Sequence, residues 1–292
     1  MQRFVDLTLN GIANGAVYAA VALSLVLIWR ATRILNFAQA GMLMVTTFIA
    51  WAAIDAGAPY AVGFLVALVS GLLLGAAVER VVIRPVEGAP PLNAIIVTLG
   101  LLVLLQAFAG MVWGGNPRSF PPAFSIKGFK IGDHTVLFSP ADLFTVVVVA
   151  ALMVGLVVLF RRTDLGLQMR AAAFEPEVSR LLGVRVGRMF GAGWALASLA
   201  GSLAGVLVAP AVFVAPTNFD AVLVFGFTAA VLGGLESPPG ALVGGALLGL
   251  ALSYVSGYLG AEMVTLGALV ILVATLMVRP NGLFAHTGTR RV

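Results

Sequence analysis

Long charge-free stretches constrain this sequence more than any other feature. Nine of them lie between consecutive charged residues, at 7–29, 34–54, 56–78, 88–117, 143–160, 189–219, 221–235, 237–261 and 263–278. A charge at the centre of a membrane helix costs about 2.5–3.5 kcal/mol, so charges collect at the ends of spans. About 20 apolar residues cross the hydrocarbon core, and most of these stretches are long enough to do so. Two short ones, 221–235 and 263–278, predict half-helices or untilted spans.

The composition supports a membrane protein. With 61% hydrophobic residues, 10% charged residues and a mean hydropathy of +1.07, the chain has too little polar surface to coat a water-soluble globule of 292 residues. We therefore predict an all-α, polytopic transmembrane bundle of about 8–9 spanning or half-spanning helices, forming a single domain over 1–292. The net charge of +5 is spread over loops rather than gathered in one stripe, so the expected partner is the lipid bilayer and not nucleic acid.

Cations are distributed unequally between the two sets of connections that alternate crossing would create. One set holds thirteen cations: Arg30, Arg33, Arg80, Arg84, Arg161, Arg162, Arg170, Arg180, Arg185, Arg188, Arg279, Arg290 and Arg291. The other holds Arg3, Arg118, Lys127 and Lys130. The positive-inside rule places the first set in the cytoplasm, with the N-terminus outside and the C-terminus inside. The outer loop, about 114–140, forms either a short hairpin cap or a plain connector, and the inner loop covers about 161–188.

Several kinds of chemistry are missing from the sequence. No Gly-Lys pair occurs, so the chain has no phosphate-binding loop of the GxxxxGK[ST] type and any ATP is hydrolysed by a partner. Zero cysteines and two isolated histidines, His134 and His286, argue against a metal site. No ionisable group lies at mid-span, which disfavours proton coupling. We predict a non-catalytic protein that binds no cofactor itself.

The inner loop contains a candidate docking helix. The stretch from Arg170 to Leu182 suits an amphipathic helix interrupted near Pro176 and stopped at Gly183. A detached helix carrying small and charged residues suits docking into a groove of another protein, or lies on the headgroups as a plain linker. The candidate docking residues are Arg170, Ala172, Glu175, Glu177, Arg180 and Gly183.

Uncharged amides begin the second charge-free stretch. Asn36 and Gln39 flank Phe37 directly after two arginines. If the helix breaks here, these residues line a water-filled translocation pathway, since irregular backbone at membrane depth is tolerated only at such places. Alternatively, Asn36 merely caps the second helix.

Glycines recur four residues apart on several spans. The pairs are Gly11 and Gly15, Gly71 and Gly75, Gly201 and Gly205, Gly240 and Gly244, and Gly245 and Gly249. Small residues let membrane helices approach closely, so we expect Gly201, Gly205, Gly240 and Gly244 to serve helix packing rather than to contact solute.

Four motifs together resemble the branched-chain amino acid ABC permease family. The segment from Ile34 to Met44 is similar to its INFAHGE-type motif, and the segment from Arg170 to Pro210 to its EAA-like loop and following helix. The glycine-rich run at 216–250 and the RPNGLF sequence at 279–284 match two further regions. Gln39, Ala40 and Gly41 replace the His, Gly and Glu of the commonest motif, and Glu236 replaces a small residue.

The resemblance implies the fold of an ABC importer permease in a bacterial-type cytoplasmic (inner) membrane. It implies a second permease subunit, identical or homologous, two cytoplasmic ATPases that use ATP and Mg, and an external solute-binding protein. The coupling helix would lie at Arg170–Gly183. The implied solutes are branched-chain amino acids or related amides, urea and aromatic acids. Two other hypotheses are an autonomous secondary carrier or channel and a noncatalytic assembly scaffold.

Overall fold

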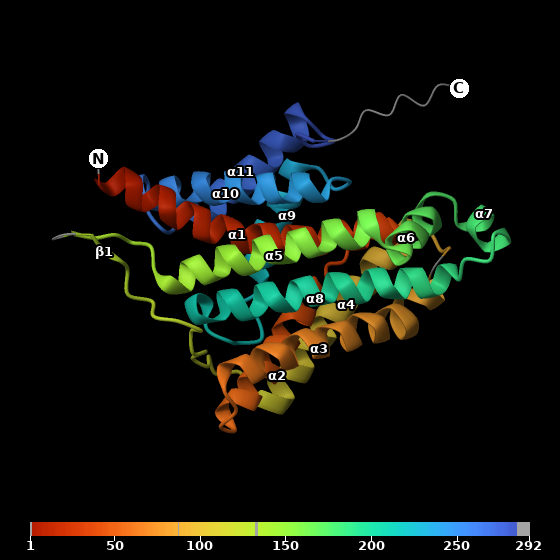
Figure 1. Ribbon diagram of the computed structural model, residues 1–292, viewed down its shortest axis with the longest axis horizontal. Helices are drawn as coiled ribbons and strands as arrows, with labels where there is room; N and C mark the ends of the chain where they lie inside the picture. The colour runs from red at the N-terminus through yellow and green to blue at the C-terminus, as the bar shows by residue number, and fades with distance from the viewer. Residues whose placement is uncertain (1, 87, 132–133, 285–292) are drawn as a thin grey trace.

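The computed structural model describes residues 2–86, 88–131 and 134–284, and helices dominate it (Figure 1). The helices are α1 (Gln2–Thr32), α2 (Gln39–Asp55), α3 (Tyr60–Val78), α4 (Pro91–Trp113), α5 (Pro140–Arg162), α6 (Asp164–Phe174), α7 (Pro176–Leu181), α8 (Val186–Val212), α9 (Asp220–Gly233), α10 (Pro238–Tyr258) and α11 (Met263–Val278). A π-helical segment, η1 (Glu79–Ile83), and a 3₁₀ turn, η2 (Arg84–Val86), follow α3. Two short strands are β1 (Lys130–Ile131) and β2 (His134–Thr135).

Each of the nine charge-free stretches contains one helix, which confirms the predicted all-α bundle. Within the described residues, six helices are long and apolar enough to cross a membrane: α1, α3, α4, α5, α8 and α10. The other three, α2, α9 and α11, have 17, 14 and 16 residues. At 1.5 Å per residue they are about 25, 21 and 24 Å long, shorter than a hydrocarbon core of about 30 Å. These three helices are therefore too short for an untilted full span, and they include α2, whose stretch 34–54 had not been predicted to be short.

Helix α1 lies at the centre of the bundle, with α10 on one side and α5 and α8 on the other (Figure 1). Of the apolar 18-residue segment in α1, 78% is buried, and of the corresponding segment in α8, 67% is buried. The corresponding segments of α4 and α5 are only 22% and 17% buried, although both helices are strongly apolar. Helices α1 and α8 therefore form the core, and α4 and α5 present apolar surface to lipid or to another subunit.

Glycine allows the closest helix contact, between α1 and α10. The backbone of Gly15 meets that of Gly249, and a methyl group on either residue would overlap the partner helix. Gly11 and Gly245 make similar approaches one turn away. Helices in lipid gain little from the hydrophobic effect between themselves, so this backbone contact supplies the van der Waals packing that holds α1 against α10.

Arginines mark the two ends of the bundle. At one end Arg33 pairs with Glu236, Arg84 donates to Gly187 O at 2.8 Å, and Arg170 donates to Phe160 O. At the opposite end Arg3 donates to Gly257 O, and Arg118 lies 4.7 Å from the ring centroid of Trp51. The described arginines of the two sets thus lie at opposite ends, whereas Arg290 and Arg291 fall outside the described residues.

The long connection between α4 and α5 folds over the end that contains Arg3. Strands β1 and β2 pair antiparallel, which favours the hairpin over the plain connector, the other alternative left open by the sequence. The amide of Leu137 donates to Asp6 Oδ1 at 3.1 Å, which ties this connection to the start of α1. Arg118 and Val214 form an antiparallel bridge, with N–O distances of 2.9 and 2.8 Å. The hairpin and the N-terminus therefore share one end of the molecule, away from α6 and α7 (Figure 1).

Candidate functional site

A sharp corner joins α5 to α6 and projects the candidate docking segment from the bundle. The hydroxyl of Thr163 caps α6 by accepting from Gly166 N at 3.1 Å. Gly166 lies against the backbone of Leu159 and Phe160, where a Cβ would overlap both. Helix α6 therefore begins at Asp164, six residues before the predicted start at Arg170, because the Thr163 cap permits a helix immediately after α5.

The predicted break and stop are both present. Helix α6 ends at Phe174, and Pro176 opens α7 as its first residue. Gly183 has φ +85°. Its amide donates to Arg180 O at 3.0 Å, and the next amide, of Val184, donates to Ser179 O at 2.9 Å. This pair of bonds is a Schellman motif, which needs the left-handed conformation that glycine adopts without strain.

Large apolar side chains are exposed on this segment. Phe174, Leu181 and Leu182 are 85%, 88% and 78% exposed. They lie at a helix end beyond the spans, beside the exposed charges of Glu175 and Glu177. Apolar side chains of this size, surrounded by charged groups outside the hydrocarbon layer, are typical of a protein-binding surface. We call the exposed side chains of Phe174–Leu182 the docking segment.

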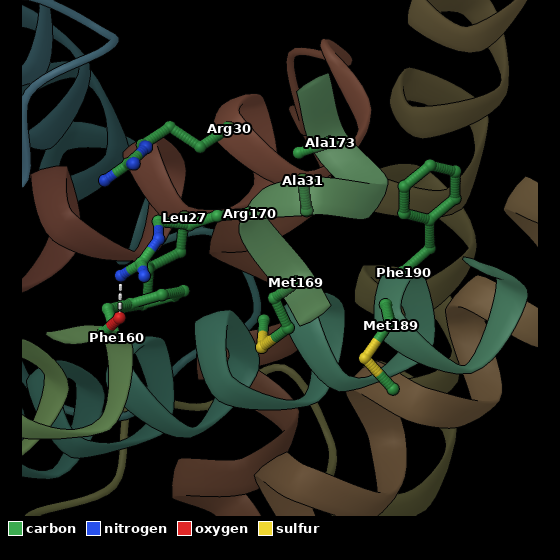
Figure 2. Close-up of a pocket in the computed structure, with 9 residues that line it drawn as sticks. All are labelled: Leu27, Arg30, Ala31, Phe160, Met169, Arg170, Ala173, Met189 and Phe190. Carbon is green, nitrogen blue, oxygen red and sulfur yellow. Dashed lines mark hydrogen bonds between the residues drawn. The ribbon is translucent and has the colours of Figure 1, made fainter. Parts of the chain in front are cut away.

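The six predicted docking residues divide into two groups. Glu175, Glu177 and Arg180 are exposed on the docking segment, and Gly183 is exposed directly after it. Ala172 is completely buried in a small cluster with Val186 and Phe190 of α8. Arg170 is half-buried and its guanidinium donates to Phe160 O, the carbonyl of a residue in the last turn of α5 (Figure 2). Arg170 and Ala172 therefore hold α6 against the bundle.

The segment 33–38 is not helical and enters the bundle. The hydroxyl of Thr98 donates to Leu35 O at 3.4 Å, and Thr98 is the eighth residue of α4. The ring of Phe37 lies 6.3 Å from that of Phe227, six residues before the end of α9. At 1.5 Å per residue these partners lie about 10 Å inside the helix ends. The chain thus breaks its helix inside the bundle, which is the condition on which the pathway interpretation of Asn36, Phe37 and Gln39 depends.

The side chains of Asn36 and Gln39 provide hydrogen-bond partners at this non-helical segment. Asn36 is 2% exposed: its Oδ1 accepts from Ala38 N at 3.1 Å and its Nδ2 donates to Gln39 Oε1 at 3.0 Å. Gln39 is fully buried and donates to Ala197 O of α8 at 3.4 Å. Asn36 is not the N-cap residue of α2: that residue is Ala38, whose own side chain makes no capping hydrogen bond, and Asn36 instead accepts from the Ala38 amide two residues further along the chain.

Three side chains of this segment face an apolar crevice of about 160 Å³. Leu35, Asn36 and Phe37 form one wall, and α9 and α11 form the others. Phe37 faces the crevice, whereas Gln39 is enclosed between α2 and α8. Of the three candidate pathway residues, Asn36 and Phe37 therefore line the crevice, whereas Gln39 does not.

The four candidate packing glycines lie at two close helix contacts. Gly201 and Gly205 of α8 face α2, where a Cβ would overlap the Gln39 amide and lie 2.5 Å from Thr47 Oγ1. Gly240 and Gly244 of α10 face the backbone of α9 at Gly233 and Ala229. The first contact also makes room for the Gln39 side chain, so Gly201 contributes to the position of segment 33–38.

Two polar pairs, one half-buried and one with a buried carboxylate, had no clear signal in the linear sequence. Gln106 Nε2 donates to both oxygens of Asp220 at 2.9 and 3.2 Å, and Glu79, 2% exposed, pairs with Arg84 at 2.9 Å. Gln106 lies seven residues before the end of α4, so α9 begins about 10 Å inside the bundle. Neither carboxylate contradicts the expectation that no ionisable group lies at mid-span, because Asp220 is the first residue of α9 and Glu79 follows the last residue of α3.

The comparisons with known proteins agree with this architecture. The sequence profile of the family described as "Branched-chain amino acid transport system / permease component" matches residues 7–277. The high-affinity branched-chain amino acid transport system permease protein LivH of Escherichia coli K12 is 28% identical over 306 residues, covering 99% of this chain and 98% of that protein. The corresponding protein BraD of Pseudomonas aeruginosa is 27% identical over 310 residues, with the same coverage.

One solved structure shares the fold. A chain of PsaBC from Streptococcus pneumoniae, solved in complex with Fab, superposes with a TM-score of 0.52 at 15% identity, covering 93% of this chain and 91% of that chain. At this identity the likeness concerns the fold alone.

Six helices that are long and apolar enough to cross a membrane, together with the family match over residues 7–277, define a transmembrane permease component of a transport system. Within that class, the chain belongs to the permease component family of branched-chain amino acid transport systems, and it is a transport subunit rather than an enzyme.

Proposed function

We propose that this chain is the translocating subunit of an importer for branched-chain amino acids or related small polar solutes. It pairs with a second permease subunit, identical or homologous, and receives its solute from an external binding protein. Two cytoplasmic ABC ATPases, using ATP and Mg, drive the cycle. The family description and the names of LivH and BraD support the solute class, and their coverage of nearly the whole chain supports the subunit role.

The orientation follows from charge. We place the end with α6, α7 and segment 279–284 in the cytoplasm and the N-terminus and hairpin outside a bacterial-type inner membrane. The cation set with thirteen members supports this placement, because most of its described members lie at or beyond the α6 end.

The exposed docking segment is the observation that carries the proposal. Phe174 and Leu181 expose apolar surface outside the spans, in the region where an ATPase would reach the permease. Helix α6 is fixed to α5 through Arg170 and to α8 through Ala172. A push on the docking segment is therefore transmitted to the ends of α5 and α8.

For the pathway we propose the crevice beside Phe37. Its apolar walls suit the aliphatic side chain of a solute, and the buried amide of Asn36 is the polar group closest to it. Gln39 acts in this scheme by holding Asn36 in place. Selectivity would rest mostly on the binding protein, since a solute captured tightly elsewhere needs only weak contacts on its way through.

The test of the docking segment is a double variant, Phe174→Ala with Leu181→Ala, in the assembled transporter. Truncation of central apolar anchors costs 2 kcal/mol or more at interfaces, so we expect ATPase binding to weaken roughly 30-fold or more and ATP-driven uptake in vesicles to fall accordingly. The matched control is Phe124→Ala with Leu137→Ala, because these side chains are 53% and 62% exposed on the outer connection. Unchanged ATPase binding and uptake in the first variant would exclude the docking role.

The alternative, an autonomous carrier or channel, predicts solute flux by the purified chain alone. The importer proposal predicts no ATP-dependent uptake in liposomes until the other subunits are added. Flux through the isolated chain at the rate of the complete system would favour the carrier.

A further inference from the structure

A crevice of about 190 Å³ opens at the α6 end of the bundle, between α1, α5 and α10. Its lining includes Leu27 of α1, residues from the last three turns of α5, and the Pro238–Pro239 pair that opens α10. The crevice lies at the ends of three helices, because Arg30 precedes the end of α1 by two residues and Arg161 precedes the end of α5 by one. Because the ends of membrane-spanning helices lie near the headgroup layer of a bilayer, we place the crevice at that depth.

Three arginines surround the mouth of the crevice. Arg30, Arg161 and Arg170 all line it, and Figure 2 shows the guanidinium groups of Arg30 and Arg170 extending in the same direction beside Phe160. Arg170 and Arg33 both repel the charge of Arg30, and Glu236 attracts it. Glu236 is already paired with Arg33. Ion pairs found in the described chain join Arg33 to Glu236 and Arg84 to Glu79, and neither includes an arginine of the crevice.

The electrostatics of this cluster favour an anion. Clustered cations in a partly desolvated crevice repel one another, and an anion placed among them converts that repulsion into charge-assisted hydrogen bonds. The known contacts leave donors free for such a group: Arg170 uses one nitrogen on Phe160 O, and Arg30 lies 5.8 Å from the Phe160 ring centroid without a hydrogen-bonding role there. A guanidinium has five donors, so both retain capacity for a phosphate.

Below the arginines the crevice is apolar. Met153, Leu156 and Val157 of α5 continue the wall toward the membrane interior, one to two turns below Arg161. On this face of α5, which packs toward α1, Leu156 is buried and Met153 and Val157 are half-buried, so the groove follows the side of α5 that faces α1. The crevice therefore combines a cationic mouth at headgroup depth with an apolar groove that leads down between helices.

We propose that this crevice binds one anionic phospholipid, with its phosphate among Arg30, Arg161 and Arg170 and an acyl chain along Met153 and Val157. Neither a free phosphate nor a neutral lipid fits the whole site. A free phosphate would leave the apolar groove empty, and a neutral lipid would leave the arginines without a counter-charge. Anionic lipids of the cytoplasmic leaflet are attracted by basic pockets of this kind. A bound lipid would connect α5 and α6 to α1 and α10. The proposal requires the membrane orientation given above but not the ATPase assignment.

The test measures lipid retained by the full chain, purified in detergent, by native mass spectrometry. Phosphatidylglycerol and phosphatidylcholine with the same acyl chains are titrated separately, and inorganic phosphate is added as a competitor. The variants are Arg30→Gln, Arg161→Gln and the groove-filling Val157→Trp. Arg162→Gln is the matched control, because Arg162 neighbours Arg161 at the same helix end but does not line the crevice. Thermal unfolding without added lipid shows that each variant is folded.

We expect one phosphatidylglycerol per chain to bind in preference to phosphatidylcholine. Each crevice arginine contributes roughly fivefold to that affinity, so Arg30→Gln and Arg161→Gln weaken binding by about that factor, whereas Arg162→Gln does not. Val157→Trp also weakens lipid binding. Equal retention of both lipids, or unchanged affinity in both arginine variants, overturns the proposal. Displacement by inorganic phosphate together with no effect of Val157→Trp would instead identify a free-phosphate site, and would equally overturn it.

Discussion

The paired amides of Asn36 and Gln39 give the sharpest energetic prediction. Both side chains are buried, at 2% and 0% exposure, and they bond to each other at 3.0 Å where the backbone is irregular. Replacing Gln39 with Met keeps the volume similar but removes the acceptor, and leaves Asn36 Nδ2 with only Met42 Sδ at 3.5 Å. An unsatisfied buried donor costs about 1–3 kcal/mol, so we expect Gln39→Met to destabilise the fold by about 2 kcal/mol.

A double-mutant cycle isolates the pair. Asn36→Leu alone should also destabilise, because Gln39 Oε1 then loses its donor, whereas the double variant leaves neither amide unpaired. Coupling between polar side chains in membrane helices averages about 0.6 kcal/mol and reaches about 1.7. Because both side chains are almost completely buried, we expect their coupling energy to lie toward the upper end of this range.

The assay is reversible unfolding of the purified chain in mixed micelles of increasing SDS fraction. Thr46→Val is the control, because Thr46 is equally buried on α2 but bonds only to carbonyls of its own helix at 3.0 and 3.1 Å, so it should cost less than Gln39→Met. Additivity of the two single substitutions within about 0.3 kcal/mol would refute the reasoning.

Three further predictions concern glycines and one ion pair. Gly249→Ala should destabilise by about 1–3 kcal/mol in the same unfolding assay, because its methyl group meets the Gly15 backbone, while Gly155→Ala, which faces open space, should not. Gly183→Ala should cost about 1–2 kcal/mol, since φ is +85° there, and Gly183→Asn should cost less; equal losses would contradict a conformational cause. Arg33→Gln should change stability by at most about 1 kcal/mol, because both partners of the Arg33–Glu236 pair are more than half exposed. A larger loss would require Arg33 to have another role.

The spans could be predicted from the sequence because charges avoid the bilayer core, so every charge-free stretch contains a helix. The non-helical parts of two of these stretches could not be predicted. Residues 34–38 and 213–219 are as free of charge as the helices beside them, yet both are non-helical. Only tertiary partners, such as Thr98 for Leu35 and Gln106 for Asp220, show how far inside the bundle they lie.

The position of the docking segment could be predicted from the sequence, but the exposure of its individual side chains could not. Pro176 and Gly183 act through local backbone geometry, so the break and the stop were visible in the sequence. Which side chains face outward depends on the corner at Gly166 and on the α8 cluster. For that reason Arg170 and Ala172 resembled docking residues in the linear sequence although they contact α5 and α8. The exposure of Phe174 and Leu181 could not be predicted, because apolar residues are common throughout this chain and these two do not differ from the others in the sequence.

Sidedness of the docking segment tests the central claim most directly. The chain has no cysteine, so single substitutions Leu181→Cys and Leu137→Cys introduce unique thiols at positions that are 88% and 62% exposed. With a membrane-impermeant maleimide, we predict labelling of position 137 in intact cells and of position 181 only in inverted vesicles. Labelling of position 181 in intact cells would place the docking segment outside and contradict the account of this chain as a permease driven from the cytoplasm.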